Sequence, residues 1–397
     1  METVKLGEVA RIVDCEHKTA PITLGGKFFA VGTPAMRGNF IDYSQARPIS
    51  AETFQDWTKR LRPKSGDILF AREAPVGPVV QIPAEENVAP GQRTVLIRPG
   101  ARVYSRFLFY LLASPQIQDH ISAIAAGSTV PHLNVSDIRS LCLGFLPGLI
   151  TQHSVGAVLG SLDDKITANQ TTISLSTQMI GAIASSPENR VPLNELAVRN
   201  TRSVNPNKLG DRLVIHHSIP SFDLGFPAVE PADSIKSNKM HVERSSVLVS
   251  KLNPRTPRVW SVPDPKQQPI SLASTEFVVL EPVDISQSQL YAATLHASFH
   301  HQLASLVGGT SNSHQRVKPE EMLDCFVPDV RGLNEAQIAL LDTLVQIKEQ
   351  SIQENVTLAK TRDELLPLLM NGKISVREAK QEATSAGADI PSEEIEA

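Results

Sequence analysis

Basic side chains at strand ends and turns provide the main binding chemistry of this sequence. They are Arg37, Lys64, Arg72, Arg93, Lys251, Arg255 and Arg258. An arginine guanidinium can form two parallel hydrogen bonds to a guanine edge, and a lysine ammonium can bind a phosphate as a point charge. Each of these residues can also be a solvated surface charge. The residue types therefore leave two interpretations open, a nucleic-acid contact surface or an ordinary polar surface.

Two glycine loops add hydrogen-bond donors at matching places in the chain. One is Gly127-Ser128-Thr129 and the other is Gly309-Thr310-Ser311. Backbone N–H and hydroxyl groups in such loops can hold a phosphate, although the same loops can be plain helix C-caps. The loops and the residues that follow them extend the set of candidate contact residues by Ser128, Thr129, His132, Thr310, His314 and Arg316.

Sequence patterns that usually mark catalysis are absent. The chain has no Gx4GK[ST] or GxGxxG loop, no HExxH zinc motif and no GxSxG elbow. The pairs His216-His217 and His300-His301 lack the i,i+4 spacing of helical zinc ligands. Pro263-Asp264-Pro265-Lys266 has no partner acid and is interpreted as a loop. We therefore expect no catalytic residue and no metal site in this chain.

Composition is that of an ordinary globular protein. The 397 residues are 41% hydrophobic and 20% charged, which predicts two or three domains. No apolar run approaches the roughly 20 residues that span a bilayer, and no signal peptide is expected. The cysteines Cys15, Cys142 and Cys325 show no CxxC spacing, so reduced core residues and a cytoplasmic location are expected. The net charge of −4 argues weakly against nonspecific nucleic-acid binding.

The chain repeats itself, because residues 4–186 and 191–374 follow one pattern. Each copy has a strand followed by a proline turn, at 66–75 and 246–254, and the two units are expected to be α+β. Helices are expected over 105–124 and 286–306. Short strands are expected at 27–32, 67–71, 78–82, 94–98 and 141–146, and again at 212–217, 246–251, 258–262, 276–281 and 324–327.

A long helix closes each copy, over 150–186 and 333–370. The first helix carries apolar residues in steps of four and three, a heptad seam that favours pairing of the two helices over separate packing of each on its own domain. Asn169 and Asn355 hold equivalent places, where they either fix the register from a buried position or face water. The expected pairing residues are Leu159, Leu162, Ile166, Asn169, Ile173, Ile180, Leu344, Ile352, Asn355 and Leu366.

This pattern resembles a known family, the DNA specificity (S) subunits of type I restriction–modification systems. The second copy ends in Leu365–Ile374, which is similar to the usual ending of that family. The second copy is the weaker match, because Arg244–Val249 lacks the Gly-Asp of the first. The other segments that carry the resemblance are Val4–Ala10, Pro63–Arg72, Gly127–Thr129 and Gln152–Asn169 with its repeat.

The resemblance implies two target-recognition domains that each read one half of a split site on double-stranded DNA. It implies a noncatalytic chain that binds two adenine-N6 methyltransferase subunits and, through them, two restriction/translocase subunits. S-adenosylmethionine, ATP and Mg²⁺ are then expected in the partner subunits and no cofactor in this chain. Two alternatives stay open, a coiled-coil protein–protein adaptor without DNA affinity and a DNA-modifying enzyme with an unrecognised motif.

The expected fold class is α+β, with two similar globular target-recognition domains, two long helices pairing as an antiparallel coiled coil, and an internal pseudo-two-fold repeat. The expected order is a first recognition domain at 1–149, a central spacer helix at 150–187, a second recognition domain at 188–331 and a C-terminal spacer helix at 332–373. Residues 374–397 are rich in Ala, Glu and Ser and are expected to be an acidic, disordered tail.

Overall fold

The computed structural model describes residues 3–126, 131–264, 269–307 and 315–390. The chain forms two compact units, one of Met1–Lys165 with Thr357–Ala397 and the other of Ile166–Val356. Both boundaries between the units fall inside long helices, so each long helix contributes to both units. No helix formed by the described residues is both long enough and apolar enough to cross a membrane.

The first unit is built on a four-stranded antiparallel sheet of order β1-β9-β6-β7. Its central strands are almost wholly apolar because both of their faces are covered. Leu69, for example, is fully buried in one cluster with Val31 of a neighbouring sheet. The four strands are β1 (Ala10–Asp14), β9 (Thr94–Pro99), β6 (Ile68–Arg72) and β7 (Val76–Gln81).

The second unit repeats this sheet in the order β11-β19-β16-β17, again antiparallel throughout. Leu248 faces Val279 in the second sheet as Leu69 faces Leu96 in the first. The predicted internal repeat is therefore confirmed by strand order. The four strands are β11 (Ala197–Asn200), β19 (Phe277–Pro282), β16 (Ser246–Ser250) and β17 (Val259–Val262).

One hydrogen bond illustrates how the repeat is kept while its residues change. In the first unit, Gln81 Nε2 of β7 donates to Ser105 Oγ of α3 (Ser105–Ala113) across 3.2 Å. In the second, Gln287 Nε2 of α8 (Gln287–Leu295) donates to Ser261 Oγ of β17 across 2.6 Å. Glutamine and serine have exchanged elements, but the bond between strand and helix remains.

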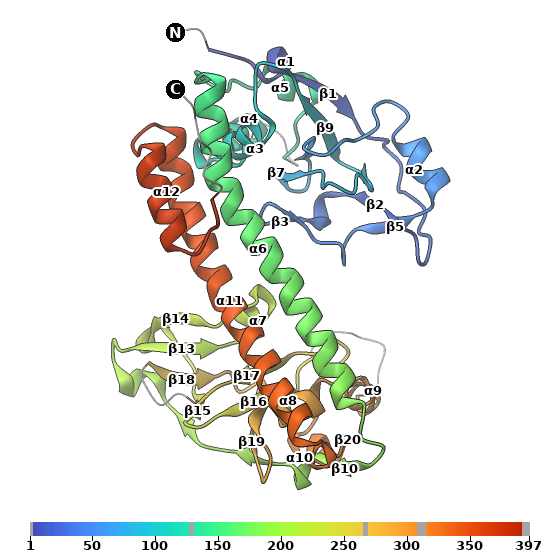
Figure 1. Cartoon of the computed structure of the whole chain (residues 1–397), viewed down its shortest axis with the longest axis vertical. Coiled ribbons are helices and arrows are strands. Elements are labelled where there is room, and N and C mark those ends of the chain that lie inside the picture. The colour runs from blue at the N-terminus through green and yellow to red at the C-terminus, as the bar shows by residue number, and fades with distance from the viewer. Residues whose placement is uncertain (1–2, 127–130, 265–268, 308–314, 391–397) are drawn as a thin grey trace. The chain divides into compact units, whose positions relative to one another are not determined.

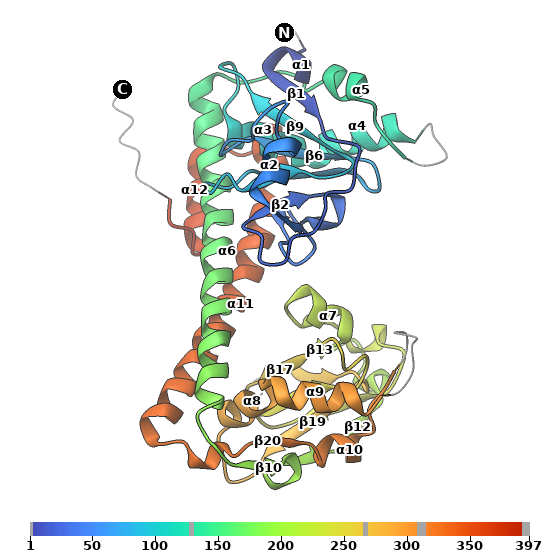
Figure 2. The same ribbon diagram turned by 90° about the vertical axis from the view of Figure 1, so that its right-hand side faces the viewer.

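A pair of helices lies in each unit where the sequence predicted one. The prediction for 105–124 is wrong at Ser114, where α3 ends and α4 (Pro115–Ala125) begins. Ser114 is extended, with ψ of 144°, because a proline disfavours helical backbone in the residue before it. The prediction for 286–306 is wrong at His296, which separates α8 from α9 (Ala297–Ser305; Figure 2) and whose side chain caps α9.

The sheets beside the repeated core differ between the units. The first unit adds β2 (Phe28–Val31), flanked by β5 (Arg47–Ile49) and β8 (Val88–Pro90). The second adds a five-stranded sheet, in the order β12 (Ser203–Val204), β15 (Lys239–Val242), β18 (Ile270–Ala273), β13 (Leu213–His217) and β14 (Ala228–Pro231). Divergence therefore concentrates outside the common sheet.

Short elements complete the units. The helices are α1 (Leu6–Val9), α2 (Ala51–Trp57), α5 (Val135–Ser140), α7 (Ile219–Leu224) and α10 (Pro319–Leu323). The strands are β3 (Met36–Arg37), β4 (Phe40–Ile41), β10 (Arg190–Pro192) and β20 (Phe326–Pro328). Within the described ranges, 3-10 turns cover Thr33–Ala35, Leu193–Glu195, Pro206–Leu209, Ala232–Ser234 and Val330–Gly332.

The two long helices, α6 (Leu149–Ala184) and α11 (Glu335–Met370), pair antiparallel as the sequence predicts (Figure 1). Asp163 of α6 meets Arg362 in the first unit, and Asn169 of α6 meets Asn355 in the second, so residue numbers rise on one helix as they fall on the other. The predicted seam residues are all at least half-buried. They are Leu159, Leu162, Ile166, Asn169, Ile173, Ile180, Leu344, Ile352, Asn355 and Leu366.

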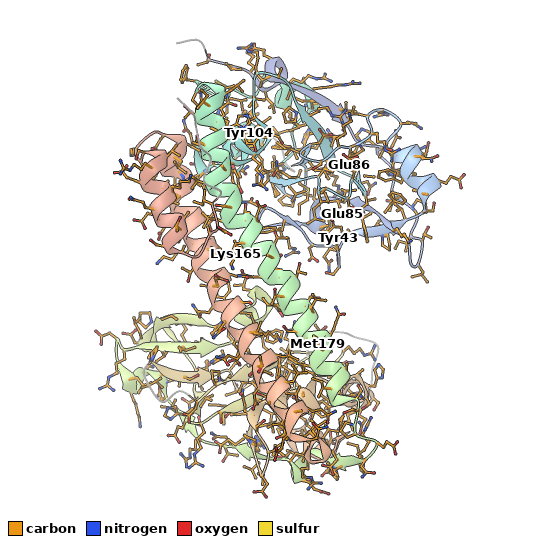
Figure 3. All side chains as sticks on the ribbon, in the orientation of Figure 1. Tyr43, Glu85, Glu86, Tyr104, Lys165 and Met179 are labelled. Atoms are coloured by element: carbon orange, nitrogen blue, oxygen red, sulfur yellow. The ribbon has the colours of Figure 1, made fainter. Side chains whose placement is uncertain are left out.

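Close packing in the first unit fixes α6 against the start of α3. The ring of Tyr104, which precedes α3, stacks on His153 of α6 with 3.8 Å between ring centroids (Figure 3). One turn further on, a Cβ atom added to Gly156 would lie 2.8 Å from Tyr104 Cε1. Only glycine therefore allows this approach of helix and ring.

Two further predictions need correction. The tail beyond residue 373 is not wholly disordered, because Val376–Ser385 forms α12. Ser375 and Glu378 make a capping box, and Ala379 and Ala383, four residues apart, are fully buried. The strand expected at 141–146 is reduced to an isolated bridge between Lys5 and Cys142. Alanine contrasts little with polar residues in a periodic pattern, so the signal for α12 in the sequence is weak. An apolar run near a single bridge looks like a strand in sequence, so a strand over 141–146 is overpredicted.

Candidate nucleic-acid interface

Three segments meet at the carboxyl end of β6 in the first unit. Arg72 N donates to Arg93 O across 2.9 Å, and Leu133 N donates to Arg72 O across 2.9 Å. An isolated antiparallel bridge joins Glu73 to His132. Residues 72–75, 91–93 and 131–133 thus form one surface, here termed the first loop edge.

The second unit builds the same surface with the same backbone contacts. Lys251 N donates to Glu276 O across 3.0 Å, and Val317 N donates to Lys251 O across 3.0 Å. Leu252 is bridged to Arg316, as Glu73 is to His132. Residues 251–255, 274–276 and 315–317 are termed the second loop edge. Each unit therefore brings three segments that are far apart in the sequence together through the same set of backbone contacts.

Left-handed backbone recurs in both loop edges. Ala74 has φ of 47° and Asn253, in the matching place before a proline, has φ of 50°. Arg93 has φ of 66° in the adjoining segment of the first loop edge. Asparagine adopts this region readily, but for alanine and arginine it costs on the order of 1–3 kcal/mol. Such conformations persist where the surrounding contacts hold them, and they are frequent at binding sites.

The charges on the two loop edges are arranged differently. Arg93 Nε lies 3.4 Å from Glu73 Oε1, and half of the Arg93 side chain is exposed. On the second loop edge, Arg316 Nε and Nη2 each donate a hydrogen bond of 2.9 Å to the Glu276 carboxylate, so the ion pair is bidentate. Arg93 and Glu276 occupy equivalent backbone positions. An arginine in the first unit is therefore replaced by a glutamate in the second.

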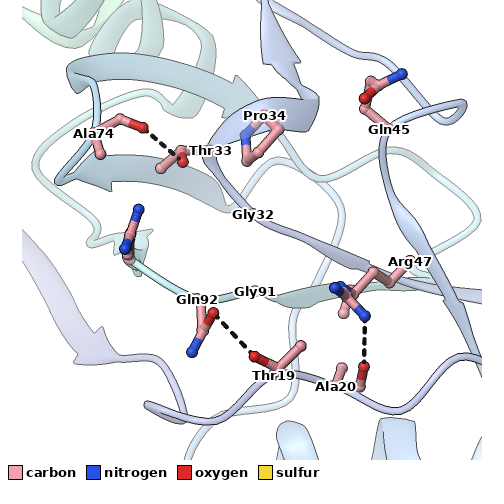
Figure 4. A pocket seen from close by; sticks show the side chains of 12 residues that line it. Thr19, Ala20, Gly32, Thr33, Pro34, Gln45, Arg47, Ala74, Gly91 and Gln92 are labelled. Atoms are coloured by element: carbon pink, nitrogen blue, oxygen red, sulfur yellow. Dashed lines mark hydrogen bonds between the residues drawn. The ribbon is translucent and has the colours of Figure 1, made fainter. Parts of the chain in front are cut away.

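A cavity of about 270 Å³ opens beside the first loop edge (Figure 4). Its wall includes polar side chains that the sequence did not single out, namely Thr19, Gln45, Arg47 and Gln92. Thr19 Oγ1 donates to Gln92 Oε1 across 3.2 Å, and Arg47 Nη1 donates to Ala20 O across 3.4 Å. Arginine and glutamine are the side chains that read guanine and adenine edges most directly.

Comparison with known proteins bears on what this surface does. Residues 1–175 match the family model of the type I restriction modification DNA specificity domain. A stretch of 120 residues is 28% identical to the type I restriction enzyme MjaIX specificity subunit of Methanocaldococcus jannaschii, covering 30% of this chain and 27% of that protein. The match thus spans little more than a quarter of that relative.

The fold is similar to a solved type I S subunit. The S subunit from M. genitalium has a TM-score of 0.58 and 15% identity, covering 93% of this chain and 95% of that one. The HsdS subunit from Thermoanaerobacter tengcongensis covers 94% of this chain and 97% of its own, with 17% identity and a TM-score of 0.33.

Residues 1–175 are thus similar to the specificity subunits of type I restriction–modification systems. The resemblance predicted from the sequence is therefore confirmed over residues 1–175, and the similarity to a solved S subunit confirms the α+β fold with paired helices. The family model matches the first copy, and the second copy is tied to it by strand order and by the repeated loop edge.

Arg72 is held by contacts within the first unit. Its side chain is 16% exposed, with Nε 3.6 Å from Asp14 Oδ1 and Nη1 donating to Leu133 O across 3.3 Å. Those contacts tie β1 and the 131–133 segment to the end of β6. Arg93 and His132, by contrast, are exposed on the first loop edge.

The other candidates are spread over several surfaces. Lys64 precedes the amino end of β6, at the other end of this strand from Arg72. Arg37 is exposed on β3. Lys251, Arg255 and Arg316 belong to the second loop edge, while Arg258 is held by Asp223 in two bonds of 2.7 and 2.9 Å. Four candidates lie outside the described residues, namely Ser128, Thr129, Thr310 and His314.

One group of possible metal ligands occurs near the first loop edge. Asp14, Cys15 and His17 bring their donor atoms within 4.8 Å of one another. Burial raises the pKa of the Cys15 thiol, which disfavours the thiolate that binds metals. The Arg72 guanidinium beside Asp14 further opposes a cation. The arrangement therefore supports no metal assignment.

The helix seam contains polar contacts that specify its register. Asn169 Nδ2 donates to Asn355 Oδ1 across 3.0 Å and to Glu354 Oε2 across 2.6 Å in the second unit. In the first unit, buried Asp163 accepts from Tyr110 Oη and from Arg362 Nη1, both at 2.6 Å. Asn169 is buried and Asn355 half-buried, so of the two interpretations of the seam asparagines the structure supports pairing within the seam over exposure to water.

Proposed function

We propose that the chain is the noncatalytic DNA-reading subunit of a type I restriction–modification complex. Each unit reads one half of a bipartite site on double-stranded DNA through its loop edge. The observation that carries this proposal is the repetition of the loop edge with the same backbone contacts and different charges. Two surfaces of one geometry and unlike chemistry suit the reading of two different half-sites.

The first loop edge has donors and acceptors suited to base edges. Arg93 is exposed at its rim, and Arg47, Gln45 and Gln92 line the adjoining cavity. Glutamine can pair with adenine through two bonds and arginine with guanine through two bonds, each worth about 1–3 kcal/mol of discrimination. Backbone N–H groups and the remaining basic residues would position the duplex through its phosphates.

The paired helices provide the proposed scaffold. We infer that α6 and α11 set the spacing of the two half-sites and carry the methyltransferase subunits, and through them the restriction subunits. S-adenosylmethionine, ATP and Mg²⁺ would act in those partners, and this chain would hold none of them. The complex would work in the cytoplasm, where the DNA is. The partly buried Asn169–Asn355 hydrogen bond supports a fixed register for such a scaffold.

An exchange of modules tests the proposal. Residues 11–149 are replaced by the matching region of another specificity subunit, and the hybrid is assembled with its methyltransferase. Sequencing of methylated adenines should find one half of the motif changed and the other half retained. A hybrid that changes both halves contradicts modular reading.

Two measurements separate the alternatives. A coiled-coil adaptor predicts no salt-dependent DNA affinity in the assembled complex, whereas a DNA reader predicts affinity that falls steeply with salt. An unrecognised enzyme predicts methyl transfer by the purified chain alone. Methyl transfer without a methyltransferase subunit would contradict a noncatalytic role.

A further inference from the structure

The second unit contains a cavity of about 580 Å³, and none of its lining residues belongs to the second loop edge. Its walls come from β13, β17, β18, α8, α11 and the segment around α7, all within residues 166–356. This volume lies in the range of small-molecule sites, roughly 300–1,000 Å³. Most of the lining is apolar, and four of the lining residues carry aromatic rings, namely His217, Phe222, Trp260 and Tyr291.

Trp260 is the centre of the aromatic wall. Its ring stands perpendicular to His217 at 4.7 Å and nearly perpendicular to Phe222 at 5.3 Å between centroids. Both Trp260 and Phe222 are only half-buried although they line the cavity. The indole therefore retains surface on which a planar ring can stack.

His217 supplies a polar group without a partner. Its Nε2 is bonded to Ser271 Oγ at 3.0 Å, but its buried Nδ1 has no hydrogen-bond partner among the described residues. The side chain is 95% buried or more, and burial lowers its pKa to about 3, so the ring is neutral. Buried polar atoms are normally satisfied, and an unsatisfied one on a cavity wall is a place for a ligand atom.

The charged groups of the wall already have partners within the unit. Glu349 accepts a hydrogen bond from Ser261 Oγ at 2.5 Å, and Lys348 Nζ donates to the Tyr291 hydroxyl. Asp264 also interacts elsewhere in the chain. A charged ligand would enter an apolar space with no counter-charge left to receive it, which is unfavourable. The wall therefore selects an uncharged molecule.

We propose that this cavity binds an uncharged, planar heteroaromatic molecule that stacks on Trp260 and hydrogen-bonds to His217 Nδ1. The site belongs to the second unit, because β7 of the first unit has Val80 where β17 has Trp260, each opposite the same leucine of its sheet. The proposal is independent of DNA reading and concerns a second ligand class.

Three small probes test the chemistry in the full-length chain by ligand-detected nuclear magnetic resonance. Quinoline offers a ring nitrogen that accepts a hydrogen bond, indole offers an N–H donor, and naphthalene has neither. Quinoline or indole, according to which His217 tautomer is present, should bind at least about tenfold more tightly than naphthalene, because a site built around a hydrogen bond rejects the analogue that lacks it. Equal affinity for all three, or no binding of either heteroaromatic probe, overturns the proposal.

Two pairs of variants locate the site. Trp260→Ala should abolish binding, and Trp57→Ala, which removes the tryptophan of the first unit, should leave it unchanged. Gln350→Trp, at an exposed position on the cavity wall, should block entry, and Gln346→Trp, exposed one turn earlier on α11 and outside the wall, should not. Should Trp260→Ala fail to fold by circular dichroism, the Gln350 and Gln346 pair decides. Unchanged binding in Gln350→Trp overturns the site.

Discussion

Each long helix has an acid six residues before its seam asparagine, Asp163 before Asn169 in α6 and Glu349 before Asn355 in α11. In the first unit Asp163 is held by Tyr110 and by Arg362, which follows Asn355 by seven residues. The residue that follows Asn169 by seven is Ser176, so no arginine stands at the corresponding step of the second unit. Glu349 instead accepts a hydrogen bond from Ser261.

A repeated backbone therefore does not require that the same side-chain interactions be repeated. A buried ion pair closes the seam in the first unit, and a neutral hydroxyl meets the acid in the second. A buried pair contributes little over an apolar alternative, but the loss of one partner leaves an uncompensated charge. The free energy of unfolding should therefore change in opposite directions in the two units when the buried acid, or the group that holds it, is neutralised.

Removal of Arg362 is expected to have the largest effect. Arg362→Ala leaves Asp163 buried without its cation and should lower the free energy of unfolding by about 3–5 kcal/mol. Chemical denaturation of the full chain measures it. Lys360→Ala, two residues away with an exposed side chain, is the control and should change stability by about 0.5 kcal/mol or less. A loss below about 1 kcal/mol in Arg362→Ala would show that water already solvates the pair.

The next largest effect is expected in DNA binding, where a substitution in the first loop edge can be compared with one in the second. Arg93→Ala in the assembled methyltransferase should weaken binding by about 1–3 kcal/mol and relax one position of the first half-site if it reads a base. A role at a phosphate would instead weaken all sequences alike and lower the salt slope by about one. Arg316→Ala should have a smaller effect, because two bonds to Glu276 already neutralise that guanidinium.

Titration of DNA across salt concentrations measures both variants. Lys59→Ala is the control, since that exposed lysine pairs with Asp56 on α2. Arg93→Ala with unchanged affinity and unchanged motif would place the DNA elsewhere on the first unit. An Arg316 effect larger than that of Arg93 would mean that the Glu276 ion pair opens on binding.

Much of the scaffold could be predicted from the sequence, because periodicity and repetition are local signals. The apolar steps of α6 and the equivalence of Asn169 and Asn355 were sufficient to predict the pairing. The break at Ser114 was readable in principle, since Pro115 follows it. The α12 helix escaped prediction because buried alanines, such as Ala379, give little periodic contrast.

The candidate site was less accessible to prediction, because folding assembles it from distant segments. Gln45 and Arg47 join Gln92 in one cavity wall although some 45 residues separate them along the chain. Arg72 carried the expected residue type at a strand end, but its side chain is largely buried within the unit, in an ion pair with Asp14 and a hydrogen bond to Leu133 O. Residue type and strand position do not reveal which arginines retain exposed donors.

The seam asparagines allow a subtler change in the second unit. Asn355→Leu removes one acceptor of Asn169 while Glu354 retains the other, so a loss of about 1 kcal/mol is expected. The double variant Asn169→Leu/Asn355→Leu should recover that loss, because two apolar residues replace a desolvated pair. Denaturation with a cross-linking test of helix register distinguishes the two effects. A double variant less stable than the single one would mean that the amides contribute net stability.

The smallest effect is expected from Glu349→Gln, and its sign depends on pH. Burial raises the pKa of Glu349 above its usual value of 4.5, so the folded chain binds the proton more tightly than the unfolded chain. The stability that this group contributes is present below pH 4.5 and is lost as the pH rises through the folded-state pKa. Glutamine does not ionise, so the variant should gain on the wild type as the pH rises from 4.5 towards 8.

Asp163→Asn provides the matched control for this substitution. It should destabilise the chain at neutral pH, because the buried Arg362 guanidinium would lose its buried carboxylate and keep only its ion pair with the exposed Asp363. Urea denaturation of both variants and the wild type across the pH range gives the two signs directly. If Glu349→Gln were as destabilising as Asp163→Asn at neutral pH, Glu349 would be held by a cation after all, and the contrast between the two units would fail.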